Sequence, residues 1–396
     1  MFLRGYNKKF TFNLLAYILH LTPSYKPAWI YGGPTLSVSQ LAEAQARLGA
    51  RIEVLTTTAN GPEELSVAAG LPQSVAGVSV RYYPRWTGDH SHFSPALLAQ
   101  LWRSARSYEV VHIHSWWNLV AMPAVLVCWL RGVKPVLSPR GMLSHYGRAS
   151  SKAKLKAAFH QLLGRWLLRK TVLHATSGQE AREALALLPG WPYFIAPNLI
   201  GLPDSPSVAA ATSGPLRLVF LSRIHPKKGL DLLFPALAAA LPFPWELTLV
   251  GAGEPDYEAE LKNRAIELGI ADRLHWLGWM EGPAKYESLA QADLMVLPSR
   301  NENFANVVLE SLAVGVPVLL TDQVGLSEYV AEKGLGWVCA PTARALEAAL
   351  KTAYTQREKY QKNRAAIAQT VRADFAPDRV AQQYLEAYAQ CAHAPA

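Results

Sequence analysis

The chain has 396 residues, of which 50% are hydrophobic and 17% are charged, and this composition excludes a disordered protein. The length favours two domains of about 200 residues over a single core. The formal net charge is +9, but residues 1–204 carry 21 lysines and arginines against 9 acidic residues, whereas residues 205–396 carry 18 against 21. The basic first half has no acidic residue between Glu109 and Glu180, so it should attract phosphorylated substrates, anionic lipid or nucleic acid.

Three features favour a cytoplasmic chain without a membrane span. The basic and apolar start imitates a signal peptide, but no small-residue cleavage site follows it. The longest apolar run, residues 119–130, is shorter than the roughly 20 residues that cross a bilayer. The cysteines are far apart and have neither metal nor disulfide spacing, which favours a reducing compartment; they are Cys128, Cys339 and Cys391.

Apolar, β-branched runs alternate with helical patterns along both halves, which predicts two parallel sheets covered by helices. The expected strands are residues 14–21, 51–57, 78–83, 110–114, 135–139 and 172–177 in the first half, and 216–222, 245–251, 273–278, 293–299 and 316–321 in the second. A linker rich in Pro, Ser, Gly and Ala lies between them at 198–215.

These patterns predict an α/β protein with two Rossmann-like domains, residues 1–204 and 205–375, whose parallel sheets face each other across a cleft. The last segment, 376–396, should form a helix that crosses back to the first domain. Ligands of open parallel sheets bind beyond the carboxyl ends of the strands, so the chemistry is expected in the cleft.

The first expected strand runs into a helix through Gly32, Gly33 and Pro34. Proline suits the first helical turn, and the two glycines leave backbone N–H groups exposed at the positive end of the helix dipole. This turn could bind phosphate. A tight turn without any ligand is the alternative.

In the second half, SRIHPKKG at 222–229 places Arg223 and Lys228 after a strand and before a helix. Two cations and free amides at such a position can neutralise a diphosphate. A solvated basic loop is the alternative.

The segment ENFANVVLE at 302–310 places Glu302 in a loop and Glu310 inside the following helix. Ionised carboxylates accept hydrogen bonds and donate none, so they suit the hydroxyls of a sugar or a ribose. Alternatively, Glu302 is simply solvated and Glu310 interacts favourably with the helix dipole.

The ordered set GGP at 32–34, SRxxxxKG at 222–229 and E-x7-E at 302–310 resembles the retaining glycosyltransferases of family 4, which have the GT-B fold. The resemblance extends over nearly the whole chain. It implies that Arg223 and Lys228 bind the diphosphate of a nucleotide sugar, that Glu310 binds the ribose and that Glu302 binds the transferred sugar. Gly33 would approach the phosphate from the other domain.

The same resemblance assigns further donor-site residues. His114, at the end of a strand, matches a family histidine near the donor sugar, although it could instead be a hydrogen-bonded core histidine. Trp279 lies where the family meets the base, with a core tryptophan as the alternative. Asn306 and Val307 begin the helix that carries Glu310 and belong to the same donor site. The chain departs from the family at Ala305 and at Asn303, where glycine is common; asparagine can still adopt a left-handed conformation. Glycine at the position of Ala305 lets the family's backbone approach phosphate; alanine narrows that space but keeps the backbone N–H.

No D-x-D triplet occurs in the sequence, which argues against a metal-bridged transferase, so we expect no metal and no cofactor. Arg223, Lys228 and helix dipoles must then stabilise the leaving nucleoside diphosphate. We expect displacement on one face of the sugar with retention, in which Glu302 orients the sugar and does not attack it.

The acceptor is expected on the first domain, where Arg140 and His145 are candidate contacts in SPRGMLSHYG. Residues 147–170 combine a Leu155, Phe159, Leu162 and Trp166 stripe with many lysines and arginines, which fits a helix on an anionic membrane surface. An ordinary domain helix with its stripe on the sheet is the alternative. We expect a saccharide or lipid-linked saccharide acceptor, a role in polysaccharide biosynthesis, peripheral attachment to the inner face of the membrane, and no nucleic acid.

Three other functions compete with this interpretation. A nicotinamide oxidoreductase is suggested by G-x-G at 251–253, but Asp256 stands where the third glycine would be. A sugar-nucleotide epimerase of the same fold would act without an acceptor. A non-catalytic basic protein that binds membrane surfaces leaves Glu302 and Glu310 unexplained.

Overall fold

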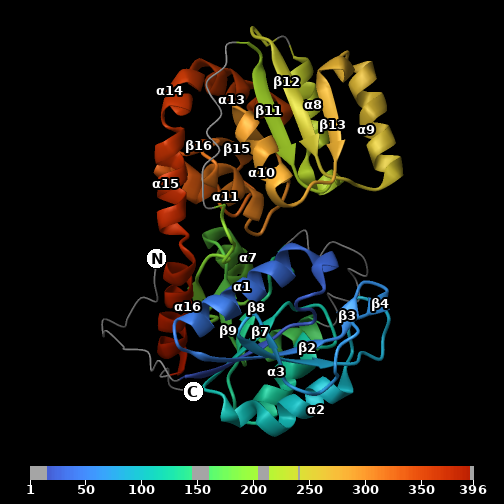
Figure 1. The fold of residues 1–396 in the computed structure, drawn as a ribbon, viewed down its shortest axis with the longest axis vertical. Coiled ribbons are helices and arrows are strands. Elements are labelled where there is room, and N and C mark those ends of the chain that lie inside the picture. The colour runs from blue at the N-terminus through green and yellow to red at the C-terminus, as the bar shows by residue number, and fades with distance from the viewer. Residues whose placement is uncertain (1–15, 145–159, 204–213, 240, 393–396) are drawn as a thin grey trace. The chain divides into compact units, whose positions relative to one another are not determined.

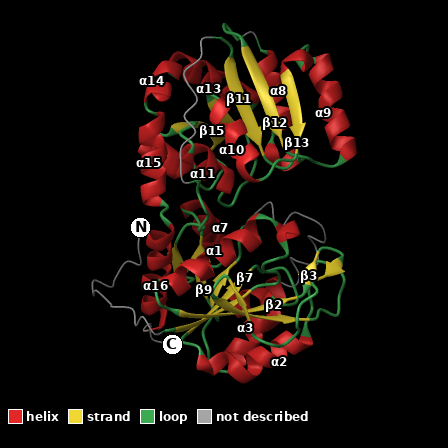
Figure 2. Ribbon diagram, viewed as in Figure 1, coloured by secondary structure: helices red, strands yellow, loops and turns green. Residues whose placement is uncertain are grey.

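The computed structural model describes residues 16–144, 160–203, 214–239, 241–391 and the backbone of residue 392. The chain divides into two compact units (Figure 1). The first unit contains Met1–Gly201 together with Phe375–Ala396, and the second contains Leu202–Asp374. Each unit is an α/β layer structure in which helices cover a central sheet (Figure 2). The predicted α/β class with two parallel sheets is therefore confirmed.

The first unit is built on an eight-stranded sheet in the order β10-β9-β8-β7-β1-β2-β6-β5, in which only β5 runs antiparallel to its neighbour among the described strands. Its central strands are apolar runs buried on both faces, as a helix-covered parallel sheet requires. The strands are β1 (Tyr17–Leu21), β2 (Arg51–Thr57), β5 (Gln73–Val75), β6 (Val78–Tyr83), β7 (Val110–His114), β8 (Val136–Ser138), β9 (Val172–Ala175) and β10 (Tyr193–Ile195).

Two apolar cores cover the faces of this sheet. One contains residues of α1 and of the last helix, which contact each other although they lie at opposite ends of the sequence (Figure 1). The other contains residues of α2, α3, α6 and α7. The helices of the unit are α1 (Gly33–Arg47), α2 (Pro95–Ser104), α3 (Ala121–Leu130), α6 (Arg165–Leu168), α7 (Gly178–Leu187) and α16 (Pro377–Ala392), and a π-helical turn, His160–Gly164, precedes α6.

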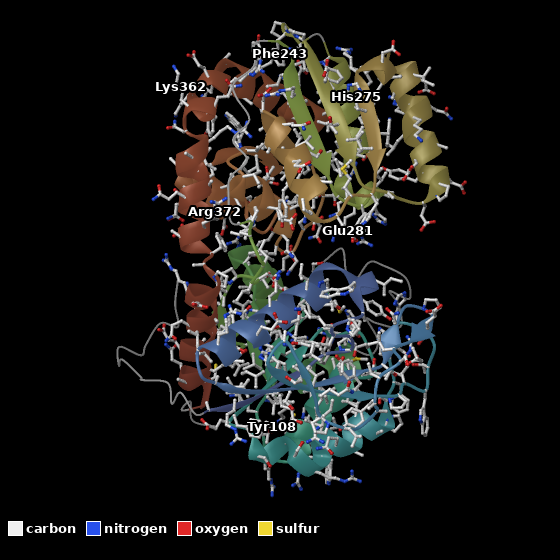
Figure 3. The ribbon with its side chains drawn as sticks, viewed as in Figure 1. Tyr108, Phe243, His275, Glu281, Lys362 and Arg372 are labelled. Atoms are coloured by element: carbon white, nitrogen blue, oxygen red, sulfur yellow. The ribbon has the colours of Figure 1, made fainter. Side chains whose placement is uncertain are left out.

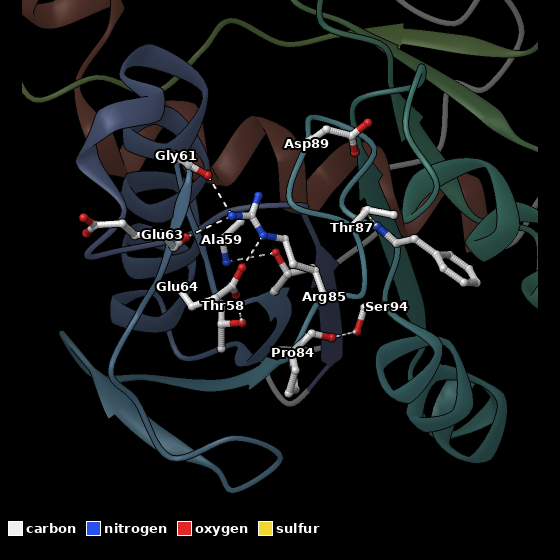
Figure 4. A network of polar contacts seen from close by, with 12 residues as sticks. Thr58, Ala59, Gly61, Glu63, Glu64, Pro84, Arg85, Thr87, Asp89 and Ser94 are labelled. Atoms are coloured by element: carbon white, nitrogen blue, oxygen red, sulfur yellow. Dashed lines mark hydrogen bonds and ion pairs between the residues drawn. The ribbon is translucent and has the colours of Figure 1, made fainter.

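A small hairpin, β3 (Ala59–Asn60) with β4 (Glu63–Glu64), is attached to the first unit by Arg85 (Figure 4). The Arg85 guanidinium forms an ion pair with Glu64. Its Nη2 also donates to the carbonyl oxygens of Gly61 at 2.7 Å and Glu63 at 2.9 Å. This buried arginine therefore has a carboxylate and two carbonyls as partners, which compensates its charge.

The second unit has a six-stranded parallel sheet in the order β13-β12-β11-β14-β15-β16. Helix α8 packs on α9 and α13, and α11 packs on α10 and α15. The strands are β11 (Leu216–Leu221), β12 (Trp245–Val250), β13 (Leu274–Gly278), β14 (Leu294–Leu297), β15 (Val318–Thr321) and β16 (Gly336–Cys339). The helices are α8 (Leu230–Ala238), α9 (Pro255–Glu267), α10 (Gly282–Gln291), α11 (Asn306–Ala313), α12 (Ser327–Lys333), α13 (Ala343–Thr355), α14 (Arg357–Lys362) and α15 (Arg364–Asp374).

Each predicted strand is present, usually trimmed by one to three residues at its ends, although residues 14 and 15 of the first lie outside the described part. The edge strands β10 and β16 and the short strands β3, β4 and β5 were not predicted. These strands are only two to four residues long, and such lengths give no periodic signal. Within the described residues, no helix combines the length and the apolar character needed to span a bilayer.

Candidate functional site

In both sheets the strand order reverses beside the first strand of the unit. In the second unit β11 lies between β12 and β14, and in the first unit β1 lies between β2 and β7. The chain leaves the two strands at such a point in opposite directions, which opens a crevice at their carboxyl ends. Most of the predicted site residues lie at the ends of these strands or on the segments that follow them, whereas Trp279 follows β13 and Arg140 follows β8.

The loop after β11 packs closely on the turn after β14. Gly229, at φ +77°, sits so near this turn that a Cβ atom there would lie 2.1 Å from the carbonyl oxygen of Pro298. Only glycine fits this position, because it tolerates the left-handed backbone and leaves room for the carbonyl. The close approach brings the basic loop 222–229 next to the segment that carries Glu302.

Glu302 and Lys228 form an ion pair in which both side chains are mostly buried, with 14% and 13% of their surface exposed. Ser299 Oγ donates a 3.4 Å hydrogen bond to the same carboxylate oxygen. The backbone of Glu302 is fixed by the segment after β15, through Glu302 N to the Gln323 carbonyl and Gly325 N to the Glu302 carbonyl, each at 2.9 Å. The residue expected at the diphosphate and the residue expected at the sugar are thus in direct contact.

Glu310 is paired with a lysine that sequence reasoning missed. Lys285, on α10, places Nζ 2.8 Å from Oε1 of Glu310, and the ammonium also lies 4.7 Å from the centre of the Tyr286 ring. Although burial alone would lower the pKa of Lys285, the neighbouring Glu310 carboxylate raises it above its usual value. The lysine is therefore charged, and its bond engages one oxygen of Glu310. Among the described residues, no hydrogen bond reaches the other oxygen.

The start of α11 has an unusual backbone. Ala305, its N-terminal flanking residue, has φ +70° and ψ +75°, and among the described residues no side chain caps this helix end. Asn306 and Val307 follow in the first turn, where backbone N–H groups lack helical partners, and both are partly exposed. The left-handed conformation allowed for Asn303 is found instead at Ala305.

Arg223 and Trp279 extend into solvent from the same edge of the second sheet. Arg223 is exposed, and within the described chain its guanidinium has neither a hydrogen bond nor an ion pair. Trp279 is 60% exposed, so the alternative of a core tryptophan is wrong. Its ring N–H donates to Glu281 at 2.9 Å; Glu281 is labelled in Figure 3.

In the first unit, the predicted glycine turn leads into α1 as expected. Gly32 has φ +61° and precedes α1, which begins at Gly33 with Pro34 next to it. All three residues are exposed, no side chain caps the helix, and its first turn has no acidic residue. The positive end of this helix dipole is thus uncompensated by its own first turn.

His114 lies inside a cluster of four buried histidines, each at most 1% exposed. The others are His20 on β1, His112 on β7 and His174 on β9. His114 Nε2 is 2.9 Å from His20 Nδ1, and His114 Nδ1 is 3.3 Å from Nη2 of Arg140. With both ring nitrogens occupied, His114 has the environment of the hydrogen-bonded core histidine that the sequence left as an alternative.

Burial keeps the whole cluster neutral. It lowers the pKa of His20 to about 4 and that of His174 to about 3, and it lowers the pKa of His112 and His114 well below the usual value. The ring nitrogens of His20, His112 and His114 lie within 4.8 Å of one another, a spacing that could hold a metal ion. These nitrogens already have hydrogen-bond partners, and the Arg140 cation is adjacent, so the arrangement fits a hydrogen-bond network better than a metal centre.

A second chain of hydrogen bonds runs through the cluster. His112 contacts the Tyr388 hydroxyl of α16 at 2.6 Å and Ser138 Oγ at 2.5 Å, Ser138 contacts His174 Nδ1 at 2.5 Å, and His174 Nε2 lies 2.9 Å from the Ala196 carbonyl. Of the two predicted acceptor-side residues, Arg140 borders this cluster, whereas His145 lies outside the described residues. The described site residues thus fall into two groups, one at the carboxyl edge of each sheet.

Comparison with known proteins assigns both units to one family. Residues 32–198 match the family model described as "Glycosyl transferase 4-like domain", and residues 205–370 match "Glycosyl transferases group 1". The D-inositol 3-phosphate glycosyltransferase of Jonesia denitrificans is 27% identical over 80% of this chain and 82% of its own. The lipopolysaccharide core biosynthesis mannosyltransferase LpsB of Rhizobium meliloti is 26% identical over 78% of this chain and 79% of its own.

Solved structures give the fold independently. Anabaena HepE in complex with UDP and glucose superposes with a TM-score of 0.69 at 20% identity, over 95% of this chain and all of its own. Sucrose-phosphate synthase from Thermosynechococcus elongatus gives a TM-score of 0.70 at 20% identity, over 95% of this chain and 99% of its own. Because consecutive family matches extend over both parallel sheets, the chain belongs to the group 1 glycosyltransferases, the GT4 family of GT-B enzymes.

Proposed function

We propose that this glycosyltransferase moves a hexosyl group from a nucleoside-diphosphate sugar to a saccharide or lipid-linked saccharide in polysaccharide biosynthesis, with retention and without a metal. The observation that carries the proposal is the Lys228–Glu302 ion pair at the reversal point of the second sheet. The pair brings together a cation that suits phosphate and a carboxylate that suits hydroxyls.

Each charged residue predicted for the donor site has a role in this reaction. Arg223 and Lys228 would bind the diphosphate, assisted by the positive end of the α11 helix dipole at Asn306 and Val307. Glu302 would accept hydrogen bonds from the transferred sugar, and the second oxygen of Glu310 would accept one from the ribose. Donor binding therefore requires Lys228 to turn from Glu302 towards phosphate.

The chemical step needs no attacking carboxylate. The bond between the anomeric carbon and the phosphate oxygen breaks, and the acceptor oxygen bonds to the same carbon on the same face. The acceptor proton passes to the departing phosphate oxygen. Arg223 and Lys228 stabilise the negative charge that develops there, which is the main source of catalysis in such a displacement.

Ligand-binding measurements can identify the nucleotide of the donor. HepE was crystallised with UDP-glucose, and starch synthase IV of Arabidopsis thaliana with ADP, so uridine, adenosine and guanosine diphosphates are the candidates to compare. A nucleotide that binds through this site should raise the melting temperature of the wild type but not of an Arg223→Met, Lys228→Met variant. Equal stabilisation of both proteins by every nucleotide would contradict the proposed donor site.

The products distinguish transfer from the competing functions. With donor and a saccharide acceptor, proton NMR of the new linkage should show the anomeric configuration of the donor. Glu302→Gln should retain residual transfer, whereas a glycosylated Glu302 in the normal cycle would contradict the mechanism. Conversion of the donor in the absence of any acceptor would instead identify an epimerase or a hydrolase.

We also propose that the first unit docks on an anionic bilayer through the exposed ends of α2, α3 and α6. Residues 147–159 of the expected basic helix lie outside the described part. In the rest, Leu162 and Trp166 of the predicted stripe are 85% and 37% exposed, whereas Leu167 and Leu168 are buried. The described part of the stripe, Leu162 and Trp166, is therefore not buried against the sheet, which favours a surface role for this part.

Tryptophans and cations of three helices share this face. Trp166 packs on Trp129 with ring centres 4.7 Å apart, and Lys170 Nζ lies 5.5 and 5.8 Å from these two rings. On the neighbouring α2, Trp102 lies 5.1 Å from the Arg131 guanidinium. Tryptophan prefers the level of the lipid headgroups, and lysine and arginine add attraction to anionic lipid.

Flotation with liposomes tests this docking surface. Arg165→Gln, Arg169→Gln and Lys170→Gln together should weaken binding to vesicles with anionic lipid about 100-fold, since each cation contributes roughly 1 kcal/mol near the surface. A matched loss of three cations from the second unit, at Lys351, Lys359 and Lys362, should have little effect. Equal binding to neutral and anionic vesicles, or no binding to either, would overturn the proposal.

A further inference from the structure

The loop between β6 and α2, residues 84–94, carries the most exposed tryptophan of the described chain. Trp86 is 77% exposed. Its ring meets the ring of Phe93 edge-on, with centres 6.0 Å apart, and among the described residues no hydrogen bond engages its indole N–H. A single exposed apolar side chain is ordinary on a protein surface. The construction of the loop therefore decides whether this tryptophan has a function.

Hydrogen bonds within the loop hold Trp86 in place. Ser94 Oγ donates to the Pro84 carbonyl at 2.7 Å and so joins the two ends of the loop (Figure 4). Trp86 N donates to the Phe93 carbonyl at 2.7 Å, and Phe93 N donates to Thr87 Oγ1 at 3.0 Å. A compact surface loop with close ends that is filled by its own side chains is an Ω-loop. A ligand that stacks on Trp86 would therefore not have to order the loop first.

The loop interlocks with segments that follow two neighbouring strands. Arg85 Nη2 donates to the carbonyl of Gly61, in the hairpin after β2, at 2.7 Å. Gly61 N in turn donates at 2.9 Å to the hydroxyl of Tyr31, which ends the short 3-10 helix η1 (Trp29–Tyr31) after β1. The Tyr31 ring lies 5.6 Å from the ring of His92, which belongs to the loop again. The three segments thus form one continuous surface at the carboxyl edge of the first sheet.

This surface extends along the sheet edge from β6 to β7. Beyond η1, Leu119 N on the segment after β7 donates to the Ser91 carbonyl of the loop at 2.7 Å. The strands beneath have the order β7-β1-β2-β6, and neighbouring strands lie about 4.8 Å apart, so the ends of β1 and β6 are about 10 Å apart. Trp86 follows the end of β6 by three residues. A ligand that extends from the reversal point beside β1 to Trp86 must therefore be longer than one sugar ring.

The chemistry around Trp86 suits a saccharide. Thr87, Asp89 and Ser91 supply hydroxyl and carboxylate groups, and Asp89 Oδ1 accepts a 2.5 Å hydrogen bond from Ser91 Oγ. An indole ring offers an apolar face to the C–H groups of a sugar, and such a polar border offers hydrogen bonds to its hydroxyls. Residues 86–94 contain neither lysine nor arginine. Unlike the tryptophans of α3 and α6, Trp86 therefore lacks the cations that attract anionic lipid.

We propose that Trp86 and the loop 84–94 bind a distal sugar of an oligosaccharide acceptor, while the sugar that reacts lies towards the reversal point beside β1. The acceptor would then contain at least two sugar rings. The role of this surface in transfer rests on the proposed function, but its binding of saccharide does not.

Saccharide binding is measured in the full-length chain. With ¹⁵N-labelled tryptophan, the indole N–H signal of Trp86 is the one that Trp86→Phe removes. The probes are cellotetraose, maltotetraose and α-1,6-mannotetraose. At least one of them should shift this signal, because stacking on an aromatic face tolerates different pyranose sugars. A Trp86 signal that none of the three shifts would overturn the proposal.

Titration calorimetry with the same tetrasaccharide gives the contribution of the ring. Trp86→Ala should weaken binding about tenfold, and Trp86→Phe should retain most of the affinity because it keeps an aromatic face. The exposed position of Trp86 makes unfolding of these variants unlikely to interfere, and thermal unfolding verifies this. Ile266→Ala, which removes an exposed apolar side chain of α9 in the second unit, should leave the affinity unchanged. Unchanged affinity in Trp86→Ala would refute the site.

Vesicles with and without anionic lipid distinguish a saccharide site from a membrane contact. If tetrasaccharide shifts the Trp86 signal and vesicles leave it unchanged, the saccharide site is supported. If vesicles broaden the signal and no saccharide shifts it, the loop is a membrane contact and the proposal is wrong.

Transfer kinetics with a monosaccharide acceptor and a tetrasaccharide of the same sugar test the role in the reaction. In the wild type, the tetrasaccharide should have a kcat/KM about tenfold higher, mainly through a lower KM, and Trp86→Ala should remove this advantage. Binding of saccharide at Trp86 without any sugar transfer would refute the proposed function alone. Transfer whose dependence on acceptor length is the same in Trp86→Ala and in the wild type would refute this inference alone.

Discussion

The two units use the same sheet geometry but opposite polar chemistry at their reversal points. In the second unit, Glu302 and Glu310 are each paired with a lysine. In the first unit, the corresponding place beside β1 and β7 holds neutral histidines and Arg140, which has no ion-pair partner among the described residues. The two lysines neutralise their carboxylates directly, whereas Arg140 donates its hydrogen bonds to the neutral side chains of Ser37, Asn198 and His114. The second unit therefore compensates the charges of its candidate site in pairs, whereas the first unit surrounds a single cation with neutral polar groups.

The largest expected effect is the loss of stability in acid, which should be greater in the first unit than in the second. His20 and His174 have folded pKa values of about 4 and about 3 against 6.5 in the unfolded chain. Below pH 6.5 the unfolded chain binds protons that the folded unit excludes, so stability is complete above pH 6.5 and falls as the pH decreases towards the folded values. At pH 5 the loss is about 2 kcal/mol for each histidine.

The stability of the second unit should change little as the pH falls from 6.5 to about 4. Burial alone would raise the pKa of Asp293, but its hydrogen bonds and ion pair with Arg217 lower it below the usual 3.8. Its stabilising contribution is therefore present above about pH 4 and is lost only as the pH falls further. Hydrogen exchange of the full chain, corrected for intrinsic rates, should show β1, β7 and β9 losing protection at pH 5 while β14 and β15 keep theirs. Equal loss in both units would refute the contrast.

The next largest effect concerns the Lys228–Glu302 pair. Glu302→Gln and Lys228→Gln should each lower kcat/KM about 100-fold, because each removes a charged group aimed at the donor. Their effects on stability should differ from their effects on activity. Each single variant leaves a mostly buried charge unpaired and should lower the unfolding free energy, whereas the double variant removes both charges and should recover much of it.

Denaturant unfolding and transfer kinetics of the three variants provide this test, and Lys351→Gln, which breaks an ordinary helix pair with Glu347, serves as the control. Additive losses of stability in the double variant would mean that the two residues are not coupled.

Residues that directly follow a strand could be predicted from the sequence. Arg223, Lys228 and Glu302 each lie within a few residues of the end of β11 or β14, so a strand pattern and a local motif were sufficient to place them at one edge of the sheet. The GGP turn could be predicted from the sequence for the same reason. The longer strands could be predicted as strands because buried parallel strands have apolar sequences.

Partners that depend on the order of strands or on helix packing could not be predicted. Lys285 reaches Glu310 only because α10 packs on α11, and the sequence contains no signal for that contact. The histidine cluster joins β1, β7, β8 and β9, which are separated by up to 150 residues or so in the chain but adjacent in the sheet. His114 was therefore identified without the partners that occupy its ring nitrogens.

A smaller effect is expected at Lys285, which forms the second ion pair of this unit with Glu310. Lys285→Met leaves Glu310 mostly buried without its cation, so the carboxylate should lose its fixed position and the KM for the donor should rise about tenfold. Lys285→Arg should restore much of the affinity, because it retains the positive charge. Glu287→Gln, on the exposed side of the same helix, should leave the KM unchanged. An unaltered KM in Lys285→Met would show that the lysine does not position Glu310.

The smallest expected effect concerns backbone strain, which both units place beside their candidate sites, at Arg140 in the first and at Ala305 in the second. Ala305→Gly should stabilise the second unit by about 0.5–1 kcal/mol, because relief of the left-handed alanine exceeds the added entropy of the unfolded chain. The same change at the exposed, helical Ala365 should destabilise it by about 1 kcal/mol. Thermal unfolding compares the two variants. If both lower the melting temperature, the left-handed backbone of Ala305 costs less than a glycine adds to unfolded-state entropy, and the strain beside the donor site is negligible.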